Sequence, residues 1–428
     1  MSSIFFYLLN SLRVAQLGNT ALIFGPTTHG ESAAEVVGGV RRSGANALLV
    51  FTSLYHGYRL IQRRYPQKAI YSLETDRVFW QPEAAFYKDC SVKPQRSLDL
   101  GAVDLIAALS RACKTEGVLM SALVPICAGE RLVQERPDLA VTNLYGSKDR
   151  LFLCYNNPDV RAYRLAMVRD LVSRYEINAL MLDKIPQTML EQHAFGGMFD
   201  APLRTVGSFC FCEHCRAAAA KYGLDLDEVQ RRALEIAQRS LKIPPYIVDA
   251  LGDQLMGDTE IPLLLLEEPL VYRMLEFRFQ SAIALVREIG ALVKSLRPRL
   301  VLQAAFVPPA HIGHDMTSPR SWLTVQSYKL YREVLDEIFC VVHWDADVVR
   351  FETQRAVAAA EGKTRIVTSM RLYGKTRPEE VATLADAALT GGSQGISFLG
   401  YDVATDELLE ALHDWTVASK DKSGGNKP

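Results

Sequence analysis

Residues 157–185 read NPDVRAYRLAMVRDLVSRYEINALMLDKI, and the expected class of fold follows from this segment. Asn157 followed by Pro158 is typical of a helix N-terminus, because asparagine caps free backbone N–H groups and proline fits the first helical turn. Apolar residues then recur at the spacing of one helix face. The segment continues into the run ALMLD at 179–183, in which four apolar residues precede one acid. A helix that leads into a strand buried on both faces predicts a parallel α/β sheet.

The same alternation extends along the rest of the 428-residue chain. Apolar runs predict strands at 21–26, 46–55, 118–127, 178–185, 299–306, 338–345, 365–373 and 395–402. Amphipathic runs predict the helices that follow them, at 32–43, 103–116, 157–172, 271–296, 322–335, 348–361, 378–390 and 407–418. Eight such units predict a (β/α)8 TIM barrel, because this number of parallel strands closes a barrel. A doubly wound open sheet is the alternative, although no glycine-rich nucleotide turn follows the first strand.

We expect residues 1–418 to form a single barrel domain, since barrels with extended loops run well beyond ~250 residues. Residues 186–267 are a predicted long insertion after the fourth strand, with a helix at 224–241. The polar residues 419–428 are expected to form a disordered tail. The apolar start, MSSIFFYLL, is shorter than the ~18 residues of a membrane span and lacks a basic region before it. A first helix against the bottom of the barrel is therefore expected.

The composition is that of an ordinary soluble globular protein, with 49% hydrophobic and 23% charged residues. The formal net charge of −1 lacks the basic excess that nucleic-acid binding requires. We therefore expect neither a nucleic-acid partner nor a membrane partner, and the sequence specifies no oligomeric state.

Three of the eight cysteines lie close together in the order Cys210-Phe-Cys212-Glu-His-Cys215. Eight cysteines in a chain of this length do not make a disulfide scaffold, so the spacing favours a metal site in a reducing compartment. The cytoplasm is the expected location. Zinc (Zn²⁺) binds thiolates tetrahedrally, and a fourth ligand must come from elsewhere in the chain. The candidates are Cys90, Cys113, Cys127, Cys154, Cys340, His193 and His214.

A resemblance to a known family narrows this choice. Residues 154–161 read CYNNPDVR and precede the strand that ends at Asp183, and residues 210–223 read CFCEHCRAAAAKYG and follow it. This order resembles the β-galactosidases of glycoside hydrolase family 42, in which one cysteine before the fourth strand and three after it bind zinc. The resemblance implies a glycosidase-like barrel with a structural zinc. The implied ligands are Cys154, Cys210, Cys212 and Cys215.

Four thiolates leave no open position for water, so this zinc is expected to hold loops together and to take no part in the reaction. In barrels the reactive groups project from the carboxyl ends of the strands. The side chains expected at these ends to contact a sugar are His56, Glu130, His343, Trp344, Arg371, Tyr373 and Asp402. Trp80, from the loop after the second strand, is expected to contact the sugar too.

Glycoside hydrolysis uses two carboxyl groups, and Asp183 is the first candidate because a buried strand delivers it directly to the rim. Family 42 has an Asn-Glu pair at this position, whereas this chain has Asp183-Lys184. An aspartate at the end of the fourth strand is more similar to the α-galactosidase type of barrel. That resemblance implies Asp183 as the nucleophile and Asp345 as the acid, with Asp347 as the alternative acid.

Three functions follow from these patterns. The first is a glycoside hydrolase that acts on a carbohydrate with Asp183 and Asp345. The second is a catalytically inactive barrel that binds a saccharide or a protein, which the missing Asn-Glu pair favours. The third is a lyase or aldolase in which Lys184 forms a Schiff base. Asp183 has a structural interpretation too, as an ion-pair partner of Lys184 or of a rim arginine.

Overall fold

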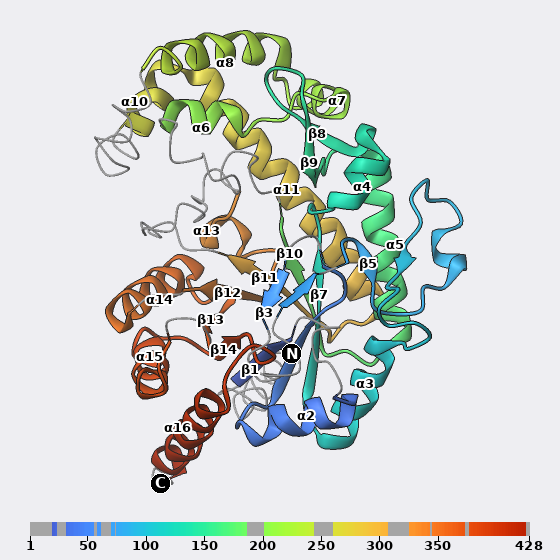
Figure 1. The fold of residues 1–428 in the computed structure, drawn as a ribbon. Coiled ribbons are helices and arrows are strands. Elements are labelled where there is room, and N and C mark those ends of the chain that lie inside the picture. Colours follow the sequence, from blue (N-terminus) through green and yellow to red (C-terminus); the bar gives the residue numbers. More distant parts are fainter. Residues whose placement is uncertain are drawn as a thin grey trace, which may run out of the picture.

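The computed structural model describes residues 19–23, 31–54, 58–60, 70–72, 74–185, 201–243, 260–306, 325–342, 345–372 and 376–424. Within them the chain forms a mixed α/β fold in which a curled parallel sheet is surrounded by helices (Figure 1). The strands of this sheet are β1 (Asn19–Ile23), β2 (Ala47–Phe51), β7 (Leu119–Pro125), β10 (Ala179–Asp183), β11 (Val301–Phe306), β12 (Glu337–Val341), β13 (Arg365–Arg371) and β14 (Ile396–Leu399).

The strands are hydrogen-bonded in the closed order β1-β14-β13-β12-β11-β10-β7-β2, with β2 paired to β1, and every neighbouring pair is parallel. Apolar runs with no polar alternation explain this arrangement, because both faces of such a strand are buried. In β10, for example, the four residues before Asp183 are all buried. The predicted α/β class with a curled parallel sheet is confirmed.

Helices follow the strands as the alternation predicts. They are α2 (Ala33–Arg42), α3 (Leu105–Glu116), α5 (Pro158–Arg174), α11 (Pro269–Leu296), α13 (Tyr328–Tyr331), α14 (Ala346–Ala360), α15 (Pro378–Thr390) and α16 (Asp406–Gly424). Local sequence signals set their ends. Asn157 accepts the Asp159 backbone N–H at the start of α5, and Gly117 ends α3 with a φ of 66°, which only glycine adopts without strain.

Three connections carry additional elements. The connection after β2 contains β3 (Tyr58–Leu60), β4 (Ile70–Ser72), β5 (Arg77–Val78), the 3-10 helix η3 (Ala84–Tyr87) and β6 (Gln95–Arg96). The connection after β7 contains α4 (Glu130–Glu135), η4 (Pro137–Leu139) and the antiparallel hairpin of β8 (Ala140–Thr142) and β9 (Lys148–Leu153). The connection after β10 contains α6 (Ala201–Gly207), α7 (Glu213–Lys221), α8 (Leu226–Ser240) and α10 (Glu260–Glu267).

The insertion after β10 is centred on a hydrophobic cluster of its own. Its helices gather at the top of the view in Figure 1, beside β8 and β9. The cluster includes residues of α6, α7, α8 and α11 together with Leu144 and Cys154 from the connection after β7. A larger cluster fills the space between the sheet and its helices. The assignment of residues 1–418 to one domain stays a prediction.

Two predicted segments differ from the structure. The predicted helix at 322–335 is wrong, because the described part of that range is helical only at α13. Val325 there has a φ of 58° and Ser327 is extended, so the helix begins after them. Of the predicted disordered tail at 419–428, residues 419–424 belong to α16, and residues 425–428 lie outside the described residues.

The N-terminal helix predicted from the apolar start falls on residues 1–18, which lie outside the described residues. Among the helices that the structure describes, none has the length and hydropathy needed to cross a membrane.

Candidate active site and cysteine cluster

Side-chain hydrogen bonds between strands of the sheet show which faces point into its interior. Ser121 Oγ donates to Gln303 Oε1 (2.7 Å) and Gln303 Nε2 donates to Glu337 Oε2 (2.6 Å). All three residues line one small cavity that several strands share. Met181 lies beside Gln303 in the parallel register. Because side chains alternate along a strand, Asp183, two residues later, also points inward.

Asp183 is the last residue of β10, at the carboxyl end of the sheet, and its side chain is half-buried. Burial raises the pKa of its carboxyl group, and the ammonium group and backbone N–H of Lys184 oppose this rise. The chain turns directly afterwards, since Lys184 has a φ of 52°, in the left-handed region that favours glycine. Ile126 N donates to Asp183 O (2.8 Å) and Cys127 N donates to Lys184 O (3.0 Å), which fixes the turn. A partly desolvated acid beside strained backbone is typical of reactive sites.

Asp345 lies at the N-terminus of α14, and its carboxylate caps that helix. Its Oδ1 accepts the Val348 backbone N–H (3.1 Å), and the side chain is exposed. A pocket of about 380 Å³ lies between the first turns of α14 and α15, and Asp345 and Arg371 both line it. The structure therefore brings these two predicted residues together. The alternative acid, Asp347, is exposed and accepts a hydrogen bond from Arg350 (2.8 Å).

Trp80 does not lie at the mouth of the sheet, so its predicted contact with a sugar is corrected. The indole is fully buried, and its Nε1–H donates to Asp170 Oδ2 (2.9 Å) on α5. This aromatic ring packs the connection after β2 against α5. Its apolar neighbours in the sequence did not distinguish a buried ring from a sugar-binding ring.

The other predicted contact residues divide into two groups. Glu130 is the half-buried first residue of α4, and Asp402 is buried just after β14. The remaining residues fall outside the described part of the chain and are His56, His343, Trp344 and Tyr373.

The sequence analysis did not identify the buried aspartates Asp170 and Asp76. Asp170 accepts hydrogen bonds from Trp80, Tyr87 (3.0 Å) and the Glu83 backbone (3.2 Å), and it pairs with Arg174. A polar residue on the apolar face of the predicted helix was the signal that marked it. Asp76 is also buried, and it has a φ of 55°. No sequence pattern marks it, because both properties arise from the path of a loop.

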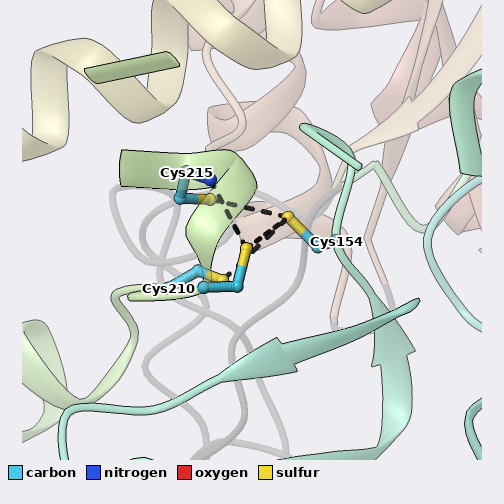
Figure 2. Close-up of side chains that lie close together, drawn as sticks. Cys154, Cys210 and Cys215 are labelled. Carbon is cyan, nitrogen blue, oxygen red and sulfur yellow. Dashed lines mark hydrogen bonds between the residues drawn. The ribbon is translucent and has the colours of Figure 1, made fainter. Parts of the chain in front are cut away.

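The four predicted cysteine ligands converge on one point. Their Sγ atoms all lie within 4.8 Å of one another, and all four side chains are buried. Cys154 Sγ lies 3.5 Å from those of Cys212 and Cys215 and 4.0 Å from that of Cys210. Figure 2 shows Cys154, Cys210 and Cys215 pointing toward one another, with Cys215 on α7. The set could hold a metal ion.

Nitrogen donors point at these sulfur atoms, as thiolates require. The Thr142 backbone N–H approaches Cys210 Sγ, and the Asn156 side-chain amide approaches Cys215 Sγ, both at 3.4 Å. Cys212 caps α7 and accepts the Cys215 backbone N–H at 3.4 Å. Hydrogen bonds from the other three thiols of the cluster lower the pKa of Cys212. The pKa of Cys154 is raised by its hydrogen bonds with Cys210, Cys212 and Cys215. Shared protons of this kind are what a bound cation displaces.

No protein-family model matches the sequence, and no curated protein matches it. Solved structures do resemble the fold. An α-L-fucosidase isoenzyme 2 from Paenibacillus thiaminolyticus gives a TM-score of 0.59 at 12% identity, over 96% of this chain and 50% of that one. The PgaB (BpsB) glycoside hydrolase domain from Bordetella bronchiseptica gives 0.56 at 12% identity, over 94% and 98%.

A β-galactosidase from the psychrophilic Marinomonas ef1 gives a TM-score of 0.56 at 11% identity, over 96% of this chain and 61% of that one. This chain thus spans about half of the fucosidase and less than two thirds of the β-galactosidase. At such identities the likeness shows the fold alone, and that fold is glycosidase-like.

Proposed function

We propose that this protein is a glycoside hydrolase with a complete (β/α)8 barrel, acting on a carbohydrate substrate. One observation carries the proposal: Asp183 is a half-buried, inward-facing acid at the carboxyl end of β10. Reactive groups of barrels lie at this end, and glycosidases use carboxyl groups whose pKa values burial tunes. The fold shared with the fucosidase and the PgaB glycoside hydrolase domain supports the same activity.

In the proposed reaction Asp183 attacks the anomeric carbon while the glycosidic C–O bond breaks. Asp345 gives its proton to the leaving oxygen. Water then attacks the anomeric carbon, loses a proton to Asp345 and releases the Asp183 carboxylate. The cap of α14 engages Asp345 Oδ1, so Oδ2 is the oxygen that carries the proton in this scheme. The proposed contacts for sugar hydroxyls are His56, Glu130, His343, Trp344, Arg371, Tyr373 and Asp402.

We propose further that the cysteine cluster binds structural zinc. A tetrahedral zinc with Zn–S bonds of ~2.3 Å places its sulfur atoms about 3.8 Å apart. The separations of 3.5 and 4.0 Å from Cys154 fit that geometry. The metal would join the hairpin after β7 to the insertion after β10, while four thiolates leave it no site for catalysis. Reduced thiolates agree with the proposed cytoplasmic location.

A catalytically inactive barrel that binds a saccharide or a protein is the second candidate. The specific observation that favours it is the carboxylate of Asp345, which is exposed and already caps a helix.

The experiment that tests the proposal measures hydrolysis of a panel of aryl α- and β-glycosides by the full chain, with calorimetric titration of the same sugars. Hydrolysis of any aryl glycoside that is lost in Asp183→Asn supports the proposal. Sugar binding without hydrolysis favours the inactive barrel. If the panel shows neither hydrolysis nor binding, that result argues against a carbohydrate-directed site.

A further inference from the structure

Asp76 reaches from the connection after β2 to the connection after β7. Its backbone N–H donates to Leu54 O (2.6 Å), which fixes it next to the end of β2. Its side chain is only 6% exposed, and Oδ2 accepts the backbone N–H of Leu132 (3.1 Å). Leu132 is the third residue of α4, where a capping side chain normally binds. The carboxylate therefore caps α4 from a distant part of the chain.

Gly129, the residue before α4, has no side chain with which to cap this helix. A Cβ atom at Gly129 would lie 3.0 Å from Leu153 Cδ1 and 3.5 Å from Asp76 Oδ1. Leu153 and the Asp76 carboxylate thus bound the space that a local capping side chain would enter. The short helix α4 depends on Asp76 for its cap.

Arg164 holds the same connection from α5. Its side chain is 3% exposed, and it donates from Nε to Ile126 O (2.8 Å) and from Nη2 to Ala128 O (3.1 Å). Arg164 therefore binds two carbonyl groups at one end of residues 126–132, and Asp76 binds an N–H group at the other end. The two side chains carry opposite charges, and burial raises the pKa of Asp76 to about 6 against the lowering charges of Arg164 and Arg131.

We propose that Asp76 and Arg164 are a pair of positioning residues that fix residues 126–132, and with them Glu130, at the mouth of the sheet. Buried polar groups that bond to the backbone at both ends of a loop favour a single arrangement of it, because releasing either one leaves a buried group without its hydrogen bond. The consequence for sugar contact by Glu130 rests on the proposed function. The fixed position of residues 126–132 does not rest on the proposed function.

Hydrogen exchange of the full chain, followed by mass spectrometry, tests the pair directly. Asp76→Ala removes the cap, so amides of 129–136 should exchange at least about tenfold faster. Asp76→Asn keeps an acceptor oxygen for the Leu132 N–H and should not speed exchange. Arg164→Lys cannot reach both carbonyl groups and should also speed exchange. Asp225→Ala is the matched control, because Asp225 caps α8 in the distant insertion and should affect only that helix.

Gly129→Ser in the Asp76→Ala background supplies a local capping side chain where the Asp76 carboxylate has been removed. It should restore slow exchange, or restore folding if Asp76→Ala alone does not fold. Unchanged exchange in Asp76→Ala, or in Arg164→Lys if Asp76→Ala does not fold, overturns the proposal.

Once a hydrolysed glycoside is identified, Asp76→Ala and Glu130→Gln should each raise its KM, and the double variant should raise it no further. Additive increases in KM would show that Asp76 and Glu130 act independently. Because exchange is measured without substrate, an inactive protein still tests the loop.

Discussion

Cys154 and Cys215 lie 61 positions apart in the sequence, yet their Sγ atoms are 3.5 Å apart. Cys154 follows β9 in the connection after β7, and Cys215 lies in α7 in the connection after β10. The two residues therefore bring two insertions together, and both belong to the hydrophobic cluster of the insertion after β10. A metal ion bound by these sulfur atoms would hold the two insertions together.

We expect the purified protein to contain about one zinc ion per chain, since a closed tetrahedral site takes four thiolates. Cys215→Ser removes one ligand and should lower the zinc content well below half. Elemental analysis of the purified variants measures it. Cys113→Ser is the control, because Cys113 is buried in α3 outside the cluster and should leave zinc unchanged. Equal zinc in both variants would contradict the assignment.

Asp183→Asn should lower kcat for a hydrolysed aryl glycoside by about 10³-fold or more, because the amide neither attacks nor accepts a proton. The expected fold is unchanged, which circular dichroism checks. Asp225→Asn is the control, since this exposed residue caps α8 in the insertion and has no part in the proposed reaction. Retained activity in Asp183→Asn would remove the proposed nucleophile.

Asp345 has two separable roles, as a helix cap and as the proposed acid. Asparagine caps helices as well as aspartate does, so Asp345→Asn should keep the melting temperature while lowering kcat. Asp345→Ala should also lose about 1 kcal/mol of stability, because the Val348 N–H loses its acceptor. Thermal unfolding and steady-state kinetics on the same variants separate the two effects. A kcat unchanged in Asp345→Asn leaves only the capping role.

The main strands could be predicted from the sequence because each is a continuous apolar run, as in Leu180–Leu182. The short strands β3 to β6, β8 and β9 could not, because two to six residues carry no periodicity and their pairing depends on the loops that bring them together. The helix predicted at 322–335 failed for a local reason. Its composition is helical, but the left-handed Val325 begins a new segment.

The site could be predicted in part. Asp183 could be predicted because an acid after four apolar residues is expected at a strand end. Cys210, Cys212 and Cys215 could be predicted from their spacing, and Cys154 from the resemblance to glycoside hydrolase family 42. Trp80 was misassigned, since sequence does not tell which side of a loop its indole faces. Asp76 was invisible, because its partner Leu132 is brought to it only by the folded sheet.

Trp80→Phe should destabilise the protein by about 2 kcal/mol, since it removes a buried hydrogen bond to a charged group and leaves unfilled space. Asp170 keeps its bonds from Tyr87 and the Glu83 backbone, so the connection after β2 should still fold. Denaturant unfolding measures the loss. Tyr145→Phe, an exposed position, is the control. A KM raised with no loss of stability would instead restore Trp80 as a sugar contact.

The ionisation of Asp76 gives the fold a pH dependence whose sign follows from its environment. Burial raises the pKa of Asp76 from 3.8 to about 6, while the charges of Arg164 and Arg131 oppose the rise. Tyr163, on α5, also senses the charge of this carboxyl group. Folding therefore favours the protonated acid. The resulting stabilisation is complete below the unfolded pKa and is lost as pH rises through about 6.

The side chain of the Asp76→Asn variant is uncharged at every pH and keeps an acceptor oxygen for the Leu132 N–H. The stability of this variant should therefore not fall as pH rises through about 6. The free energy of unfolding of this variant minus that of the wild type should rise between pH 4 and pH 8. Two pKa units at about 1.4 kcal/mol each set an upper bound of about 3 kcal/mol on this rise. Denaturant unfolding at pH 4, 6 and 8 measures it, with Asp225→Asn as the matched control because Asp225 caps the exposed start of α8. A difference that falls with pH would mean that the positive charges of Arg164 and Arg131 outweigh burial, and that the ionised carboxylate stabilises the loop.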